Sequence, residues 1–287
     1  RFEVARSTAD ARRIRAAGRM ALALGIENGA AIEDDLGLLR HFAERGVRYV
    51  TLTHAEDNLI CDSSYATTGT HGGLSPFGRE VVAEMNRLGI LVDVSHVTDE
   101  AFDDVLEVTQ VPVIASHSAC RRFVPGFERN LDDERIRALA ANGGVFQVNF
   151  GSIFLTAEAN RRMDADRQAI EHLLATNGAE RGSDEARELV RRWREEHPPE
   201  LTHVGDVADH IEHVVALAGI DHVGLGSDYD GVGSVPAELA DVSCYPALVE
   251  ELLRRGWSEA DLRKLLGENL MRVWAEAERH AAAQAAG

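Results

Sequence analysis

The sequence has little cysteine and little positive charge. Its three cysteines, Cys61, Cys120 and Cys244, are odd in number and widely spaced, which fits neither a disulfide framework nor a thiolate metal site. The 30 lysines and arginines are outnumbered by 48 aspartates and glutamates, so the formal net charge is -18. Such an acidic surface repels phosphate backbones, and nucleic-acid binding is not expected. The scarcity of cysteine favours a reducing compartment, and we expect a cytoplasmic protein.

Long apolar runs are missing as well. No stretch of 18 or more apolar residues occurs, so no membrane-spanning segment is expected. No signal peptide is visible, and the first residue is Arg1 rather than methionine. No glycine-rich dinucleotide fingerprint follows any predicted strand. With 287 residues, of which 45% are hydrophobic, the chain has ample material for the core of one large domain.

Short apolar, β-branched segments alternate along the chain with amphipathic helical segments. This alternation predicts a parallel sheet covered by helices, either as an open doubly wound sheet or as a closed eight-stranded barrel. The predicted strands are Ala21–Glu27, Arg48–His54, Ile90–His96, Val111–His117, Gly144–Asn149 and Asp221–Asp228. The predicted helices are Ile32–Glu44, Gly78–Leu88, Asp99–Val108, Asp132–Ala141, Val207–Ala218, Tyr245–Arg255 and Ser258–Ala283.

The carboxyl ends of the predicted strands distinguish the two architectures. A barrel gathers its active site from many strand ends, whereas a doubly wound sheet concentrates it at one switch point. Because all six predicted strands end in a polar residue, we expect an α/β fold of the (β/α)8 TIM-barrel type, as a single domain over residues 1–287. A barrel needs eight strand–helix units, so we expect the first two to be missing. The strand-end residues are Glu27, His54, His96, His117, Asn149 and Asp228.

The segment from Thr156 to Pro199 differs from the rest of the chain. It is rich in arginine, glutamate and alanine and carries no strand pattern. We expect a helical insertion at about 156–199, after the fifth predicted strand, which forms either a rim over the barrel mouth or a solvated excursion.

Two histidines end consecutive predicted strands in similar phrases, Asp93-Val-Ser-His96 and Ile114-Ala-Ser-His117. Imidazoles at neighbouring strand ends can converge on one metal ion. Glu27 ends the first predicted strand, where a carboxylate is costly unless it is paired or bound to metal. A carboxylate can also bridge two cations about 3.5–4 Å apart. We therefore predict Glu27, His96 and His117 as metal ligands.

Three further residues are candidates for catalysis and substrate binding. Asp228, on the last strand, can take a proton from a bound hydroxide and pass it to a leaving amine. Its neighbour Asp230 precedes a glycine and is better explained as a turn residue. His54 is positioned to contact the substrate or polarise its carbonyl group, and Arg129 to clamp a substrate carboxylate. The histidines interpreted as surface or packing residues are His71, His203, His210, His213 and His222.

These motifs together resemble the membrane dipeptidase (renal dipeptidase) family of zinc peptidases, over a region from Leu22 to Arg279. The phrases that carry the resemblance are Gly25-Ile-Glu27-Asn-Gly, Arg48-Tyr-Val-Thr-Leu-Thr-His54, Gly73-Leu-Ser-Pro-Phe-Gly78, Asn86-Arg-Leu-Gly-Ile-Leu-Val-Asp93-Val-Ser-His96, Ser116-His117-Ser118, Arg129-Asn130, Gly226-Ser-Asp228-Tyr-Asp230-Gly231 and Glu268-Asn269. The order and spacing of these phrases make the combination specific.

The resemblance implies a (β/α)8 barrel with two zinc ions per active site. Glu27 matches the bridging carboxylate, and His96 and His117 match the ligands of the second zinc. Asp228 matches the acid/base residue, while His54 and Arg129 match residues that contact substrate. The implied reaction is hydrolysis of dipeptides, including L,D-dipeptides, by metal-bound hydroxide.

The sequence departs from the family pattern at the first zinc. That ion also needs a His-x-Asp pair before the bridging glutamate, and the 26 residues that precede Glu27 contain none. The ligands present therefore complete about one zinc site. Two alternatives stay open, namely an amidase or lactam hydrolase on the same site, and a truncated barrel without activity. The donors also suit manganese, cobalt or iron. We further expect a homodimer.

Overall fold

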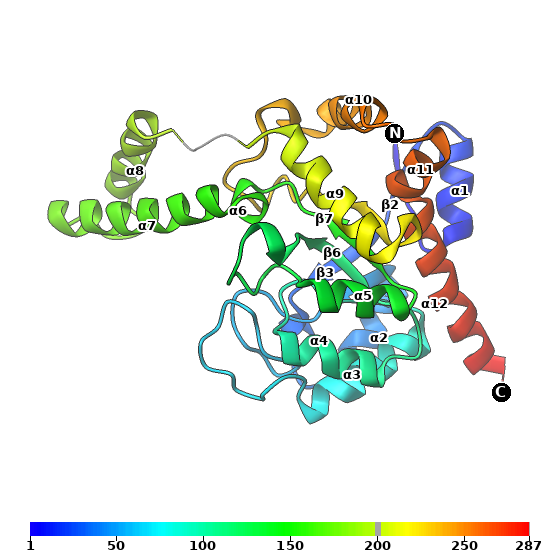
Figure 1. Cartoon of the computed structure of the whole chain (residues 1–287). Helices are drawn as coiled ribbons and strands as arrows, with labels where there is room; N and C mark the ends of the chain where they lie inside the picture. Colours follow the sequence, from blue (N-terminus) through cyan, green and yellow to red (C-terminus); the bar gives the residue numbers. More distant parts are fainter. Residues whose placement is uncertain (199–201, 287) are drawn as a thin grey trace.

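The computed structural model describes residues 1–198 and 202–286, and its central element is a six-stranded parallel sheet (Figure 1). The strands pair in the order β3-β4-β5-β6-β7-β8, which is also their order along the chain. A doubly wound sheet would reverse this order at its switch point, whereas a barrel adds each strand beside the previous one. The expected α/β fold of the TIM-barrel type is confirmed. The strands are β3 (Leu24–Glu27), β4 (Val47–Thr51), β5 (Leu91–Asp93), β6 (Ile114–Ser118), β7 (Val145–Val148) and β8 (Val223–Leu225).

The amino-terminal residues form a strand–helix unit that the sequence analysis missed. β1 (Phe2–Val4) is followed by α1 (Thr8–Ala16) and pairs in parallel with β2 (Met20–Leu22), which continues into β3 after Ala23. The count of two missing units is therefore wrong, because the described residues contain seven strand positions rather than six. β1 was overlooked because it has three residues, too few to show a period. Among the described residues, β1 and β8 pair with a strand on one side only.

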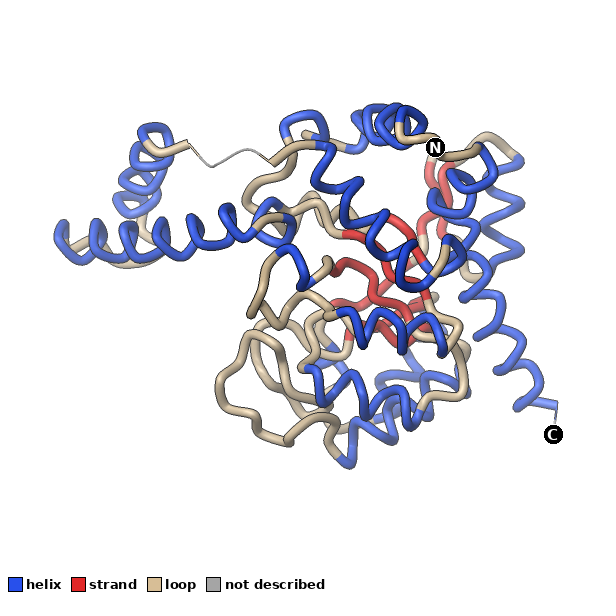
Figure 2. The backbone as a smooth tube through the Cα atoms, viewed as in Figure 1, coloured by secondary structure: helices blue, strands red, loops and turns tan. Residues whose placement is uncertain are grey.

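Helices cover the outer face of the sheet, as Figure 2 shows. The expected alternation of strand and helix is confirmed, although the helix predicted to begin at Ile32 begins at Leu36. The helices between successive strands are α2 (Leu36–Arg45), α3 (Pro76–Leu88), α4 (Asp99–Val108), α5 (Asp133–Ala141) and α9 (Val204–Ala218). The chain closes with α10 (Tyr245–Arg254), α11 (Glu259–Arg263), a π-helical turn at Lys264–Glu268 and α12 (Asn269–Ala286).

Local sequence explains where these helices begin and end. The Ser75 hydroxyl accepts a hydrogen bond from the backbone N–H of Gly78, and Pro76 occupies the first turn of α3. α3 ends at Gly89, whose φ of 69° is the left-handed conformation that glycine adopts without strain. The predicted helix start at Ser258 is confirmed by a capping box with Asp261. These caps fix the lengths of the loops that lead back to the sheet.

The core has two parts. The larger lies between the sheet and the outer helices, and β5 is buried along its whole length, as expected for a strand covered on both faces. The smaller lies inside the curve of the sheet, where Leu91, Ile114 and Val145 pack with Val273 and Trp274 of α12. α12 therefore supports the strands from the inner side and leaves their carboxyl ends open to the site. In the described part of the chain, no helix is long and apolar enough to cross a membrane.

The segment predicted as a helical insertion consists of two helices that project from the barrel (Figure 1). After the short helix α6 (Ser152–Leu155), the chain forms α7 (Ala157–Asn177) and α8 (Asp184–Glu196). The last residue of the predicted segment, Pro199, lies outside the described residues. That this segment acts as a rim over the site stays a prediction.

Candidate metal centre and active site

Three predicted metal ligands converge at the carboxyl ends of the strands. The Oε1 atom of Glu27 lies 3.2 Å from Nε2 of His96 and 3.1 Å from Nε2 of His117. The two Nε2 atoms are 2.9 Å apart. The structure therefore brings together one carboxylate and two imidazoles from β3, β6 and the loop after β5, which lie far apart in sequence.

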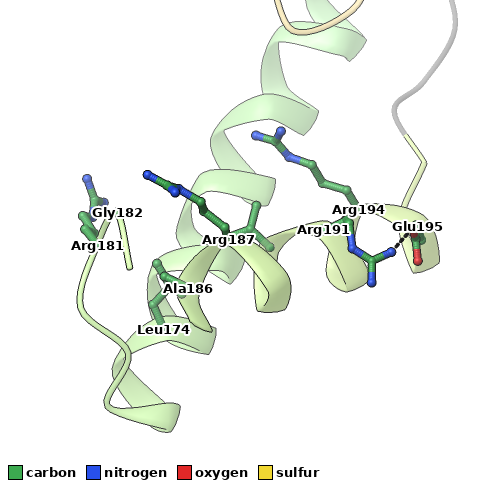
Figure 3. A pocket seen from close by; sticks show the side chains of 9 residues that line it. Leu174, Arg181, Gly182, Ala186, Arg187, Arg191, Arg194 and Glu195 are labelled. Carbon is green, nitrogen blue, oxygen red and sulfur yellow. Dashed lines mark hydrogen bonds and ion pairs between the residues drawn. The ribbon is translucent and has the colours of Figure 1, made fainter. Parts of the chain in front are cut away.

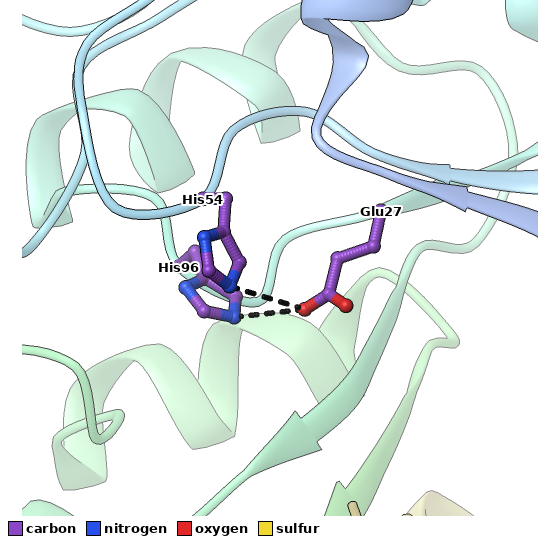
Figure 4. Close-up of side chains that lie close together, drawn as sticks. All are labelled: Glu27, His54 and His96. Carbon is purple, nitrogen blue, oxygen red and sulfur yellow. Dashed lines mark ion pairs between the residues drawn. The ribbon is translucent and has the colours of Figure 1, made fainter. Parts of the chain in front are cut away.

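His54 lies at the same place, as Figure 4 shows together with Glu27 and His96. Its Nε2 atom is 3.8 Å from Oε1 of Glu27, and its ring centroid is 4.5 Å from that of His96. About half of its side chain is exposed, whereas His96 and His117 are largely buried. His54 is thus placed to meet a molecule that enters from solvent.

His96 and Asp228 both have an unusual backbone conformation. Both follow their strands by three residues and have positive φ, 73° for His96 and 58° for Asp228. For residues with a side chain this conformation is strained and persists only where surrounding contacts enforce it. The carbonyl oxygen of His96 accepts two hydrogen bonds from Ser64, one from its backbone N–H and one from its hydroxyl group. The prediction that the strands extend through both residues is wrong, because strand pairing ends at Asp93 and Leu225, before these turns.

The charge states of the cluster suit a cation. The neighbouring imidazoles of His117 and His96, within hydrogen-bonding distance of Oε1, hold the pKa of the Glu27 carboxyl well below its usual range. Burial, helped by the nearby charge of Arg129, lowers the pKa of His96 to about 3. Near neutral pH an anionic carboxylate therefore faces a neutral imidazole with an available lone pair.

This donor set fits a divalent metal ion. Carboxylate oxygen and imidazole nitrogen bind zinc at about 2.0–2.2 Å, and ligands of one tetrahedral ion lie roughly 3.3 Å apart. The separations of 2.9–3.2 Å among Glu27, His96 and His117 are close to that value. His54 extends the set, since Glu27, His54 and His96 also offer ligand atoms within 4.8 Å of one another.

Asp228 lines the same cavity as Glu27 and His117, a space of about 500 Å³. Its Oδ2 atom accepts a hydrogen bond from Nδ2 of Asn149 at 3.0 Å, and Oδ1 of Asn149 accepts one from the backbone N–H of Gly151 at 2.6 Å. The second bond fixes which way the Asn149 amide faces. The sequence predicted no role for Asn149. Its predicted position at the end of a strand, which it shares with the candidate site residues, was the only sign that it could belong to the site.

Gly231 makes room for the Asp228 carboxylate. A Cβ atom at Gly231 would lie 2.1 Å from Oδ1 of Asp228, far inside contact distance. The Ser-Asp-Tyr-Asp-Gly phrase is thus a turn in which the glycine is needed for space rather than for a positive φ. Asp230, the rival acid in this phrase, is exposed, in keeping with the turn role predicted for it.

Arg129 is a buried cation beside the metal centre. Its side chain is 1% exposed, Nη2 donates to the carbonyl oxygen of His117 at 2.9 Å, and Nη1 donates to the Ser118 hydroxyl at 3.1 Å. Its guanidinium carbon lies 5.4 Å from the ring centre of Phe154. Among the described residues no carboxylate oxygen lies within 4.0 Å of its nitrogens. The sequence suggested its role but not its burial, because arginines are mostly exposed.

Two aromatic side chains near the centre were missed by sequence reasoning. The ring of Tyr65 is 5.9 Å from that of His96 and 6.1 Å from that of Phe127, between centroids. Burial, together with the Asp228 charge, raises the pKa of the Tyr65 hydroxyl, although Arg129 opposes this shift. Both residues lie in loops, and nothing in the pattern around them indicates a site.

A second hollow, of about 550 Å³, lies between α7 and α8 and is lined by several arginines (Figure 3). Most of these arginines pair with acids of the same two helices, as Arg191 does with Glu188 and Glu195. Arg181 likewise pairs with Glu171. The hollow is therefore a solvated helix face rather than a site for an anion.

Of the histidines predicted to be surface or packing residues, His210 is the most buried, with no exposed area. Its Nδ1 accepts a hydrogen bond from the backbone N–H of Cys120, and its Nε2 donates to the carbonyl oxygen of Leu155. It thereby joins α9 to the loop after β6 and to α6. Burial lowers its pKa to about 4 from the usual 6.5.

We expect this histidine to make stability depend on pH. Between pH 6.5 and about 4 the unfolded chain takes up a proton that the folded chain does not, so the free energy of unfolding falls as the pH falls through this window. Across the whole window, the free energy of unfolding falls by about 3 kcal/mol. His210→Gln can keep both hydrogen bonds but does not titrate, so this variant should not lose this stability at low pH. Urea unfolding at pH 7 and at pH 4.5 measures the difference. The control is His213→Gln, one turn along α9. Equal pH dependence in wild type and His210→Gln would contradict the assignment.

Comparison with known proteins identifies relatives. The family model described as membrane dipeptidase (peptidase family M19) matches residues 1–286. The dipeptidase tcpJ of Claviceps purpurea is 37% identical over 284 residues, which cover 99% of this chain and 57% of that protein. The chain spans little more than half the length of the curated relatives that it matches.

Solved structures agree with the sequence comparison. The probable dipeptidase PvdM from Pseudomonas aeruginosa has a TM-score of 0.83 and 29% identity, with 98% of this chain and 75% of that chain covered. A metallopeptidase from Rhodobacter sphaeroides, liganded with a phosphinate mimic of the dipeptide L-Ala-D-Ala, has a TM-score of 0.77 and 28% identity, with 96% and 69% covered. Because the family model covers nearly every residue and the fold agrees, the chain belongs to the membrane dipeptidase family of peptidases.

Proposed function

We propose that this protein hydrolyses the peptide bond of dipeptides with the help of a divalent metal ion. The observation that carries the proposal is the buried guanidinium of Arg129, which has no carboxylate partner among the described residues and donates to the backbone of His117, a candidate metal ligand. A buried charge without a partner is costly, and a substrate carboxylate would supply that partner.

The placement of this cation also limits the substrate. A dipeptide has one residue between its terminal carboxylate and its scissile carbonyl group, so one molecule can reach both Arg129 and the cluster around Glu27. The phosphinate mimic of L-Ala-D-Ala bound by the Rhodobacter sphaeroides relative supports this substrate class, and so does the name of the Claviceps purpurea relative. L,D-dipeptides are therefore included in the proposal.

Glu27, His96 and His117 would hold the metal ion, which supplies Lewis-acid polarisation of the carbonyl group and activation of water. Around it, each side chain has a separate task. Arg129 binds the terminal carboxylate and fixes the orientation of the dipeptide. His54, half exposed at the entrance, donates an N–H to the carbonyl oxygen as negative charge develops there.

Asp228 moves the proton in this mechanism. Its carboxylate accepts a proton from the attacking water and then delivers it to the nitrogen of the departing amine. Asn149 donates to Oδ2, which leaves Oδ1 for this transfer. No proton needs to enter from solvent during the step.

For the metal we propose zinc, because the ligands are one carboxylate and two imidazoles. The family resemblance implies two zinc ions per active site, and no histidine occurs in the 26 residues before Glu27. The chain's own residues therefore supply the ligands of about one ion. The homodimer and the cytoplasmic location expected from the sequence stay predictions, and light scattering at micromolar concentration tests the first.

A hydrolysis panel tests the proposal. The zinc-loaded protein is offered L-Ala-L-Ala, L-Ala-D-Ala and N-acetyl-L-alanine, and release of free amino acid is measured. We expect at least one dipeptide to be cleaved, cleavage to stop with a chelator and zinc to restore it. Preference for N-acetyl-L-alanine would replace the proposal with an amidase. No cleavage by zinc-loaded protein would favour the inactive barrel.

A further inference from the structure

A buried carboxylate lies behind the candidate metal ligands and takes no part in the proposed reaction. Asp93 ends β5, has no exposed area, and lies between Thr51 of β4 and residues of β6. A carboxylate at such a position is costly unless donors surround it. Its surroundings therefore define what it does.

Both oxygens of Asp93 are fully used. Oδ1 accepts the backbone N–H groups of Ser95 at 3.1 Å and Ser116 at 2.8 Å. Oδ2 accepts the hydroxyl groups of Thr51 and Ser116, each at 2.5 Å. In all four of these bonds the carboxylate is the acceptor, so the single hydroxyl hydrogen of Ser116 is directed to Asp93.

The same hydroxyl oxygen also contacts a candidate metal ligand. Oγ of Ser116 lies 2.6 Å from Nδ1 of His117. The hydroxyl group of Ser116 donates its hydrogen bond to Asp93, so its oxygen can only accept a hydrogen bond from the imidazole ring. Nδ1 of His117 therefore carries the ring hydrogen. In a neutral imidazole with its hydrogen on Nδ1, Nε2 has no hydrogen and offers a lone pair.

We propose that Asp93, acting through Ser116, is a positioning residue that fixes the tautomer of His117 and turns its Nε2 lone pair toward the metal. The inference rests on the proposed metal-dependent function. Nε2 of His117 lies 3.1 Å from Oε1 of Glu27 and 2.9 Å from Nε2 of His96, so in this tautomer its lone pair faces the space among the candidate ligands. Partners of this kind typically change metal affinity 10- to 100-fold.

The direction of this hydrogen-bond chain can be reversed by one substitution. In Asp93→Asn the amide that replaces Oδ2 donates to Ser116, which then donates to Nδ1 of His117, and the ring hydrogen moves to Nε2. Two-bond ¹H–¹⁵N correlation spectra of the metal-free protein report the tautomer, and His117→Gln assigns its signals. We expect a hydrogen on Nδ1 in wild type and on Nε2 in Asp93→Asn. A hydrogen on Nε2 in wild type would overturn the proposal.

Zinc affinity, measured by competition with a chromophoric chelator, gives the second readout. We expect Ser116→Ala to weaken zinc binding 10- to 100-fold and Ser116→Thr, which keeps the hydroxyl group, to restore it. Thr51→Val is the matched control, because it removes one hydrogen bond to Asp93 but leaves the link from Ser116 to His117. Its affinity should stay within about threefold of wild type.

The outcomes separate this inference from the proposed function. If Ser116→Ala binds zinc as tightly as wild type, or if Thr51→Val weakens binding equally, the positioning role is refuted. Thermal unfolding of each variant identifies any loss that comes from misfolding. If wild type itself binds no zinc, the proposed function fails, while the tautomer measurement still decides the state of His117.

Discussion

Asp228→Asn is expected to lower kcat for a dipeptide by about a thousandfold while zinc binding stays unchanged. General acid–base catalysis contributes about 10²–10⁴ to rate, and an amide of the same shape cannot accept and return a proton. Asn149 can still donate to the new side-chain oxygen, so the local geometry is kept. Steady-state kinetics and metal content per chain check both halves of the result.

Asp230→Asn is the matched control for this prediction. Asp230 lies two residues further along the same turn, is exposed, and has no role in the proposed proton transfer. Its substitution should leave kcat within about threefold, as surface changes generally do. The assignment fails if Asp228→Asn remains active, or if both variants lose activity to the same extent.

Arg129→Met is expected to lower kcat/KM for a free dipeptide by about 100- to 1000-fold. Two charge-assisted hydrogen bonds to a carboxylate contribute about 3–4 kcal/mol, and each 1.4 kcal/mol corresponds to a factor of ten. Methionine fills similar space without the charge, so the buried pocket is not emptied. Initial rates at substrate concentrations well below KM give the ratio.

The dipeptide amide separates substrate binding from structural damage. Wild type should cleave the amide poorly, because it offers Arg129 no anion, and Arg129→Met should cleave it about as well as wild type does. An equal loss on both substrates would show that the arginine supports the fold through His117 and Ser118 rather than binding the carboxylate.

The sequence could predict the parts of the fold that depend on periodicity. Apolar strands and amphipathic helices indicated the order of the sheet, and Glu27 and His117 lie in strands as expected. β1 could not be found this way, because two of its three residues are exposed. The positive φ of His96 and Asp228 also leaves no trace in the pattern, since contacts formed by the fold impose it.

The hydrogen-bond networks that cross between strands also could not be predicted from the sequence. Asn149 and Asp93 gain their roles from partners on other elements, and the direction of each bond depends on which group has a hydrogen to give. The burial of Arg129 likewise depends on contacts with β6 and with the ring of Phe154, which lie elsewhere in the sequence. Sequence spacing can bring such residues to one edge of a sheet, but it cannot assign donors and acceptors.

The most direct test of the account is anomalous diffraction at the zinc absorption edge from crystals of the zinc-loaded protein. We predict a peak bounded by Oε1 of Glu27 and Nε2 of His96 and His117, about 2.0–2.2 Å from each. A peak that leaves any of these three atoms outside its coordination shell, or no peak at full zinc loading, would contradict the metal centre on which the proposed function depends.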